Sequence, residues 1–205
     1  MQLSLAHTSK EIQGKLTITG SKSETNRLLL LQALYPELAI ENKSNSDDSV
    51  AMEHALVSKE NLKDIHHAGT AMRFLTAYFA TKNESSIVLT GSQRMQERPI
   101  ALLVDALRSL GADINYTKEE GYPPLEIIGK DLAGGKVSLP ANISSQYISA
   151  LLLIAPRLKQ GLELELEGEI TSLPYIKMTL ALLKRVGITS TFEEKIIRIP
   201  NQEEI

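Results

Sequence analysis

Glycines and prolines recur along this chain at a nearly constant distance, and this internal repeat constrains the fold more than any other feature of the sequence. In each copy a strand reaches a glycine, a proline opens an apolar-periodic helix, a second glycine closes that helix, and two short strands follow. Proline in the first turn of a helix and glycine just past its end are the usual helix boundaries. The matched positions are Gly91 and Gly168, Pro99 and Pro174, and Gly111 and Gly187, at offsets of 77, 75 and 76 residues.

A strand and a helix with small residues at its start precede each copy, so the pattern predicts a β-α-β-α-β-β unit. The first full copy predicts strands 63–67, 86–90, 113–117 and 125–128 and helices 69–80 and 99–110. The second predicts strands 136–139, 162–166, 188–192 and 195–199 and helices 144–155 and 174–186. An incomplete earlier copy predicts strands 16–19 and 38–41 and helices 24–34 and 47–56.

Some of these helices are apolar on much of their surface, notably in the runs 28–31 and 151–154. A helix that is apolar all round is a buried helix. We therefore predict an α/β domain of three related units, in which a ring of sheets surrounds buried helices.

Composition excludes several classes of function. The net charge is −3, no block of basic residues occurs, and the aromatic residues are 6 Tyr and 3 Phe, which argues against a nucleic-acid surface. The absence of cysteine removes thiolate nucleophiles and thiolate metal sites. The longest apolar run, 150–155, is far shorter than the about 20 residues of a membrane-spanning helix. Because the first residues lack a signal-peptide pattern, we expect a cytoplasmic protein without nucleic-acid or membrane partners.

Hydroxyl-bearing and small residues gather at the starts of four predicted helices. Free backbone N–H groups and the helix dipole make a helix start a site for anions, so four starts brought together predict a polyanion site. Ser and Thr are also the commonest N-caps, and capping without any ligand is the alternative interpretation. The segments are 21–23, 68–70, 144–146 and 171–175.

Cationic side chains near these starts favour the anion site. Lys22 and Arg27 flank one start, where two cations oppose the helix dipole unless an anion is present. Ser23 and Arg27 are four residues apart and share one helical face. Arg94 and Arg98 have the same spacing in the loop before the next helix. A solvated loop, or pairing of Arg98 with an acid, is the alternative there.

Signals for metal or acid–base chemistry are weak. The four histidines lack the spacing of metal ligands, and the adjacent pair His66 and His67 would point to opposite faces of a strand. We interpret Asp47 and Asp48 as acids at a helix N-terminus. The glycines form no nucleotide-binding fingerprint, so we expect neither a metal nor a cofactor.

Five motifs follow one another across nearly the whole chain. They are Gly20-Ser21-Lys22-Ser23-x-x-Asn26-Arg27, Ala68-Gly69-Thr70-Ala71-Met72-Arg73, Leu89-Thr90-Gly91-x-x-Arg94-Met95-x-x-Arg98-Pro99-Ile100, Ser144-Ser145-Gln146 and Ser172-x-Pro174-Tyr175-Ile176. Any one of them alone is weak, but in this order the set resembles the EPSP synthase family. The resemblance implies a two-domain enzyme of the inside-out α/β barrel type, with three β-α-β-α-β-β units in each domain.

The same resemblance implies that this chain is about the N-terminal half of an enzyme that is a monomer when complete. Residues 1–19, including strand 16–19, would belong with the missing C-terminal domain. Residues 20–200 would form the N-terminal domain, and residues 201–205 would lie at the boundary to the missing half. The strands within residues 1–19 would have no strands to pair with if this half of the enzyme were isolated.

The family reaction transfers the enolpyruvyl group of phosphoenolpyruvate to the 5-hydroxyl of shikimate 3-phosphate, through a tetrahedral intermediate and with release of phosphate. The resemblance implies no cofactor. It assigns Lys22 a catalytic role, because its charge can stabilise the developing adduct. The shikimate 3-phosphate residues it implies are Lys22, Ser23, Arg27, Ser144, Ser145, Gln146, Ser172 and Tyr175. The phosphoenolpyruvate residues it implies are Lys22, Gly69, Arg94 and Gln146.

Three positions depart from the family pattern. His67 stands where Asn is common, Phe74 where many members have Pro, and Leu173 where Lys is frequent. The first two flank the loop at Gly69, which leaves room for the inhibitor glyphosate in the phosphoenolpyruvate pocket. Sensitivity of the complete enzyme to glyphosate is therefore a hypothesis.

Other functions remain as alternatives. The sister enolpyruvyl transferase acting on UDP-N-acetylglucosamine usually pairs Lys with Asn and carries a loop Cys, whereas Ser23 follows Lys22 here and Cys is absent. A second alternative belongs to a different class of function, namely a half-domain that binds anions without catalysis. An RNA phosphate cyclase-like protein is possible at the level of fold, but the net negative charge disfavours it.

Overall fold

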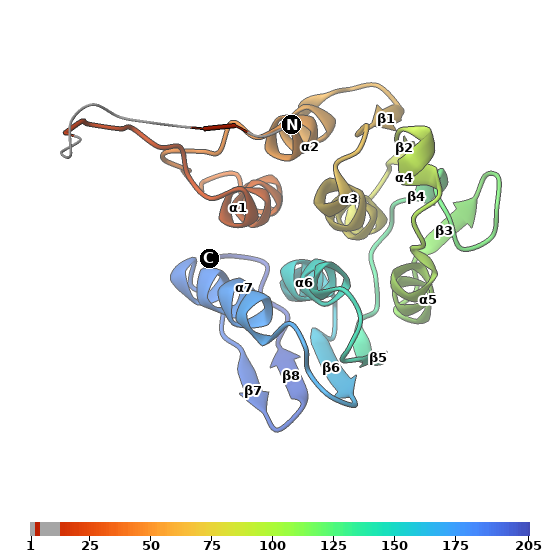
Figure 1. The fold of residues 1–205 in the computed structure, drawn as a ribbon. Helices are drawn as coiled ribbons and strands as arrows, with labels where there is room; N and C mark the ends of the chain where they lie inside the picture. The colour runs from red at the N-terminus through yellow and green to blue at the C-terminus, as the bar shows by residue number, and fades with distance from the viewer. Residues whose placement is uncertain (1–2, 5–12) are drawn as a thin grey trace.

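The computed structural model describes residues 3–4 and 13–205 of the chain. Two four-stranded sheets and a set of helices make up the described part (Figure 1). The first elements are α1 (Lys22–Leu34), α2 (Asp47–Val57), β1 (Leu62–Asp64), α3 (Gly69–Thr81), β2 (Ser86–Thr90), α4 (Gln93–Gln96), α5 (Ala101–Ser109), β3 (Asp113–Tyr116) and β4 (Leu125–Ile128). The others are β5 (Gly135–Pro140), α6 (Ser145–Ile154), a 3₁₀ turn (Ala155–Arg157), β6 (Leu162–Glu167), α7 (Leu173–Arg185), β7 (Thr191–Glu193) and β8 (Ile196–Ile199).

The two sheets have the same topology. Their strand orders are β1-β2-β4-β3 and β5-β6-β8-β7. In each, the first pair is parallel and the other two pairs are antiparallel. Strand, helix and connection therefore repeat in the same order from β1 to β4 and from β5 to β8, which confirms the internal repeat and the mixed α/β class.

Two helices, α3 and α6, lie at the centre of the described part (Figure 1) and contribute many residues to its hydrophobic core. α3 is buried from Gly69 to Ala80 except at Thr70, and α6 is buried from Tyr147 to Ile154. They pack against each other between the sheets (Figure 1). α6 is apolar on nearly every side, so its burial removes apolar surface from water around most of the helix, as the sequence predicts for the run 151–154. α3 is buried as well, although it also carries Arg73 and Thr76. α5 and α7 bury only one face.

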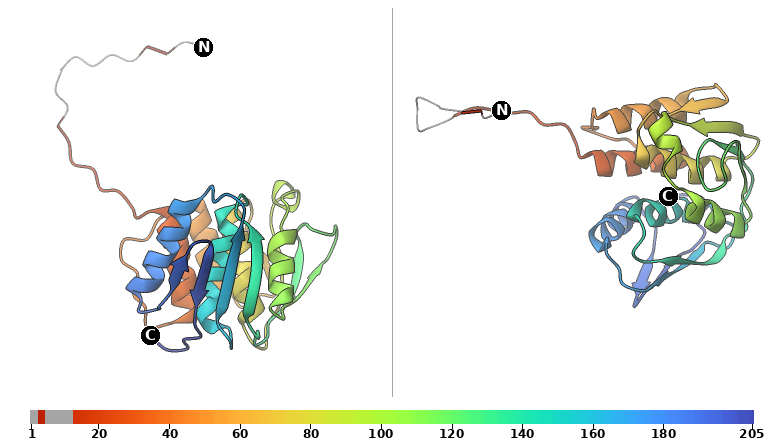
Figure 2. Two further views of the ribbon diagram at one scale, coloured as in Figure 1. Left: turned by 90° about the horizontal axis from the view of Figure 1, so that it is seen from below. Right: turned by 45° about the vertical axis from the view of Figure 1, so that its right-hand side comes forward.

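Two predicted strands of the incomplete first unit are not formed: the one at 38–41 is wrong, and the one at 16–19 has no partner in the described structure. Residues 16–19 and 38–41 form neither helix nor strand. The segment from 13 to 19 runs away from the helices in an extended form (Figure 2), with Leu16 and Ile18 90% and 78% exposed. A strand exists only when a neighbouring strand accepts its hydrogen bonds, and no described strand lies beside either segment. The first unit therefore supplies α1 and α2 alone.

The strand predicted at 63–67 ends early. β1 stops at Asp64, whose carboxylate accepts the backbone N–H of His66 at 2.8 Å. His66 has a φ of 49°, in the left-handed region that breaks a strand. His66 and His67 therefore lie in a turn and not on opposite faces of a strand. Strand 188–192 likewise starts late, at Thr191, and the short helix α4 was not predicted.

Packing at Gly129 provides a test of this fold. A methyl group there would collide with the main-chain carbonyl oxygens of Lys82 and Phe79. We expect Gly129→Ala to lower the free energy of unfolding by about 1–3 kcal/mol, because overpacking forces the backbone to shift. Urea denaturation measures this, with Gly14→Ala as the control, since nothing lies within 4 Å of that position. Equal midpoints for the two variants would contradict the packing of this turn.

Within residues 3–4 and 13–205, no helix has the length and apolarity needed to cross a membrane.

Candidate anion-binding site at the helix starts

Hydrogen bonds of one buried arginine bring the starts of three helices together. Arg27 of α1 donates from Nε to Thr179 Oγ1 of α7 at 2.8 Å and from Nη2 to Ser149 Oγ of α6 at 2.9 Å. Each of these residues lies between one and two turns after the start of its helix. The starts of α1, α6 and α7 therefore lie at the same end of the molecule, which is the arrangement that an anion site would need. In Figure 1 these helices are viewed nearly along their axes.

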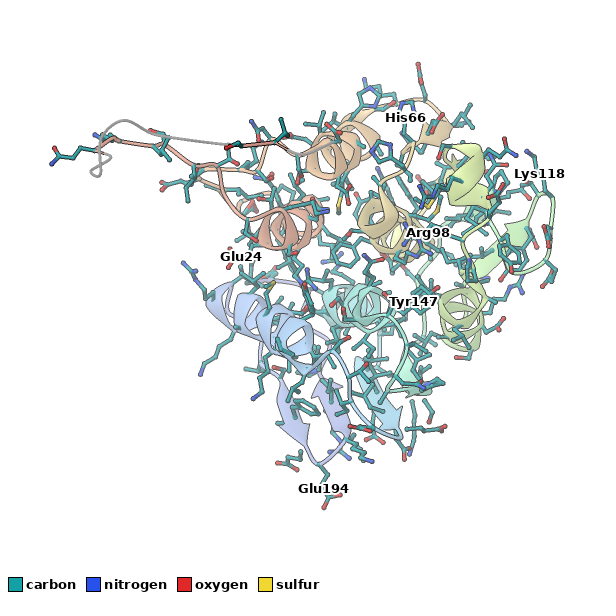
Figure 3. The ribbon with its side chains drawn as sticks, viewed as in Figure 1. Glu24, His66, Arg98, Lys118, Tyr147 and Glu194 are labelled. Atoms are coloured by element: carbon teal, nitrogen blue, oxygen red, sulfur yellow. The ribbon has the colours of Figure 1, made fainter. Side chains whose placement is uncertain are left out.

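A second set of contacts adds the starts of α3 and α5. Gln146 Nε2 donates to Thr70 Oγ1 at 3.1 Å and joins the first turns of α6 and α3. Arg73 Nη2 donates to the carbonyl of Pro99 at 2.9 Å, and the hydroxyl of Tyr147 donates to the same oxygen at 2.6 Å. Figure 3 labels Tyr147 beside α6, with Arg98 near α3. Five helix starts are thus held at one end, where their dipoles add.

Some of the predicted hydroxyls serve as caps. Ser21 accepts the backbone N–H of Glu24 at 3.4 Å, and Ser144 accepts that of Gln146 at 3.3 Å. The capping alternative is therefore correct for these two residues. Ser172 makes no side-chain cap to α7, although it stands at the N-cap position. Its hydroxyl and that of the half-buried Ser145 are among those that local capping does not occupy.

Lys22 lies at the rim of the helix starts. Its side chain is 49% exposed, and Nζ lies 3.6 Å from a carboxylate oxygen of Asp48. Asp47 and Asp48 occupy the first turn of α2, as predicted, and Ser46 is the N-cap. The contact between Lys22 and Asp48 was not predicted, because it joins two helices that the sequence does not place side by side.

Arg27 is one of two deeply buried cations among the helix starts, and Arg73 is the other. Arg27 is 3% exposed, and its Nη1 donates to the carbonyl of Ser23 at 2.8 Å. The ring of Phe74 covers one face of the guanidinium at 5.4 Å. Burial lowers the pKa of Arg27 to about 10, because a charged group is disfavoured away from water. The arginine remains charged at neutral pH.

The second arginine pair takes two different positions. Arg94 is exposed on α4. The guanidinium of Arg98 lies so close to Gly69 that a methyl group there would collide with Nη1. Gly69 thus permits Arg98 to approach the start of α3, a contact that sequence reasoning did not find. The alternative of an acidic partner for Arg98 is not seen among the described ion pairs.

Some of the predicted site residues are in contact with one another, and others are not. Ser23 and Arg27 are in contact, and Gln146 reaches the first turn of the helix that begins at Gly69. Tyr175 is 46% exposed, but its backbone carbonyl accepts the hydroxyl of Thr179 and links it to the Arg27 network. Arg94 makes no described hydrogen bond or ion pair to the other predicted site residues.

A separate groove lies on the outer side of α2 and β1. Its volume is about 610 Å³, and its lining includes Val50, His54, Leu62 and His67. Among the described residues, no group of His, Asp and Glu side chains has an arrangement that could hold a metal ion. The groove reaches Asp47 and Ala68 at the starts of α2 and α3, but its lining includes none of the predicted cations Lys22, Arg27, Arg94 and Arg98.

Comparisons with known proteins agree on one family. A model of the family described as EPSP synthase (3-phosphoshikimate 1-carboxyvinyltransferase) matches residues 37–204. The 3-phosphoshikimate 1-carboxyvinyltransferase of Bacteroides fragilis (strain YCH46) is 48% identical over 183 residues, which are 89% of this chain and 44% of that protein. That of Haemophilus influenzae (strain PittEE) is 40% identical over 206 residues, covering 86% and 48%.

Solved structures show the same likeness. The EPSP synthase from Acinetobacter baumannii has a TM-score of 0.76 at 22% identity, over 94% of this chain and 48% of that one. At that identity the likeness supports the mixed α/β fold alone. The chain spans about half the length of the curated relatives it matches.

Proposed function

Since this chain belongs to the EPSP synthase family, we propose that it supplies the shikimate 3-phosphate side of a 3-phosphoshikimate 1-carboxyvinyltransferase. The enzyme would move the enolpyruvyl group of phosphoenolpyruvate to the 5-hydroxyl of shikimate 3-phosphate and release phosphate. A cytoplasmic location and a monomeric complete enzyme stay predictions.

The gathering of five helix starts around cationic side chains is the observation that carries this proposal. Each start offers backbone N–H groups and the positive end of a dipole. Both substrates are small molecules that carry a carboxylate and a phosphate, so they need several anion contacts close together. The starts of α1, α3, α5, α6 and α7 would supply these contacts.

Shikimate 3-phosphate would lie over α1, α6 and α7. Its phosphate would take the hydroxyls of Ser144, Ser145 and Ser172, two of which are not used as caps. Its carboxylate would take Ser23 and Arg27. Gln146 and Tyr175 would border the ring. Planar guanidinium groups suit carboxylates because they can donate two parallel hydrogen bonds.

Phosphoenolpyruvate would lie between the starts of α1, α3 and α4. Lys22 would neutralise charge on the tetrahedral adduct, and this makes it the catalytic residue of the chain. The Asp48 carboxylate would release Lys22 when the anion arrives, because an ion pair with a half-exposed lysine contributes little stability. Arg94, Gln146 and the backbone at Gly69 would complete the pocket.

The fold proposal is an inside-out barrel. Two copies of the β-α-β-α-β-β unit have identical strand orders and bury α3 and α6 behind their sheets, and α1 and α2 would be the helices of the third unit. A second domain of the same kind would close over the helix starts and exclude water from the reaction.

Calorimetry with the purified chain tests this function. We expect shikimate 3-phosphate to bind weakly and unesterified shikimate to give no measurable heat, because the phosphate contacts dominate. We also expect no phosphate release when phosphoenolpyruvate is added, since the proposed closing domain is required. Absence of binding by a folded chain would contradict the proposed binding site, and turnover by the chain alone would contradict the need for a second domain.

A further inference from the structure

Among the described residues, the charge of Arg27 has no acidic partner within ion-pair distance. This arginine is nevertheless only 3% exposed. Buried charges are normally paired, because leaving one unpaired is costly. Its side-chain partners are the hydroxyls of Ser149 and Thr179, which are themselves fully buried.

The hydroxyl hydrogens fix the direction of these contacts. Thr179 Oγ1 donates its single hydrogen to the carbonyl of Tyr175 at 2.9 Å, so it can only accept from Arg27. Ser149 Oγ lies 2.9 Å from Thr179 Oγ1 and can donate there while it accepts from Arg27. Both hydroxyls therefore present oxygen to the guanidinium, and neither can turn away without losing a buried hydrogen bond.

The contacts of the Arg27 guanidinium leave only two of its N–H groups for a ligand. Of its five N–H groups, one on each nitrogen is used by Thr179, Ser149 and the carbonyl of Ser23. One N–H remains on Nη1 and one on Nη2. Phe74 covers one face of the plane. The group is thus held in a fixed orientation while it keeps its full positive charge, which a carboxylate partner would have cancelled.

We infer that Ser149 and Thr179 are positioning residues, which hold the Arg27 guanidinium in place for the carboxylate of shikimate 3-phosphate by neutral hydrogen bonds. This inference rests on the proposed function, because it assumes that Arg27 meets that carboxylate. None of the five sequence motifs includes these two residues. Ser149 lies in the apolar helix α6, and Thr179 lies on the buried face of α7.

Thr179→Val is the decisive change, because valine keeps the shape of threonine and removes the acceptor for Arg27 Nε. We expect it to weaken shikimate 3-phosphate binding about tenfold, the size of one hydrogen bond to a charged group. Thr179→Ser should restore binding, since it returns the hydroxyl. Inorganic phosphate should bind equally to all variants, because it lacks the carboxylate.

Thr76→Val is the matched control. Thr76 is also fully buried in a helix and also donates to the carbonyl four residues earlier, that of Met72 at 2.7 Å, but Arg27 does not bond to it. A variant that only lowers stability should therefore behave like Thr76→Val, with unchanged affinity in the folded protein.

The Arg27 Nε–H signal in nitrogen-15 NMR spectra separates positioning from binding. In the unliganded wild-type chain this proton should exchange slowly with water, and in Thr179→Val it should exchange faster. Wild-type affinity in Thr179→Val, or unchanged exchange of this proton, would overturn the inference. If the wild type does not bind shikimate 3-phosphate at all, the proposed function fails. The carboxylate part of the inference then falls with it, and the exchange rates still decide whether Thr179 holds Arg27.

Discussion

Arg27→Met is expected to weaken shikimate 3-phosphate binding about 100-fold, because two charge-assisted hydrogen bonds to a carboxylate contribute roughly 3 kcal/mol. The free energy of unfolding should change by no more than about 1–2 kcal/mol, because removal of a buried charge without a counterion offsets the loss of its hydrogen bonds and of its contact with Phe74. Ser149 and Thr179 can still bond to each other. Calorimetry and urea denaturation measure the two effects.

Arg185→Met is the matched control for this change. Arg185 is exposed in the last turn of α7, so the same substitution there should alter neither binding nor stability. A loss of several kcal/mol of stability in Arg27→Met would contradict the view that this arginine is kept for ligand binding. Wild-type affinity in that variant would remove Arg27 from the proposed site.

Phe74→Ala is expected to lower the free energy of unfolding by about 3–5 kcal/mol, the usual cost of removing a fully buried phenylalanine. Phe74 is 0% exposed in α3 and lies against the guanidinium of Arg27. Its removal would leave a cavity in the core and uncover the charged group. Thermal or urea unfolding provides the measurement.

Phe74→Leu separates the two contributions of the ring. Leucine fills most of the space but lacks the aromatic face, so its cost should stay near 1 kcal/mol, with about 0.5–1 kcal/mol of that from the lost cation–π contact. If alanine and leucine cost the same, the space beneath Arg27 is not tightly packed, and the position assigned to Phe74 is wrong.

Much of the fold could be predicted because its period is visible in the sequence. Glycines and prolines mark the ends of α5 and α7 in equivalent places, and the matching sheets follow from the same spacing. The segments 16–19 and 38–41 have the composition of strands, yet they have no partner in the described structure. A sequence pattern shows whether a segment can form a strand, but it does not show which strand will pair with it.

The candidate site was predicted where its signals are local. Residue types at helix starts indicate Ser23, Arg27 and Gln146 as candidates, because caps and anion sites depend on neighbours in the sequence. Ser149 and Thr179 were missed because their contacts with Arg27 span 122 and 152 residues. A serine inside the apolar run of α6 was the available signal, since a buried hydroxyl needs a partner.

The central claim is that the helix starts form one site for a phosphorylated shikimate. An amide NMR titration of this chain with shikimate 3-phosphate, with shikimate as the control, tests it most directly. We predict saturable shifts that cluster at Ser23, Arg27, Ser145 and Ser172 and are absent with shikimate. Shifts elsewhere, such as along the α2 and β1 groove, or no shifts from a folded chain, would contradict the claim.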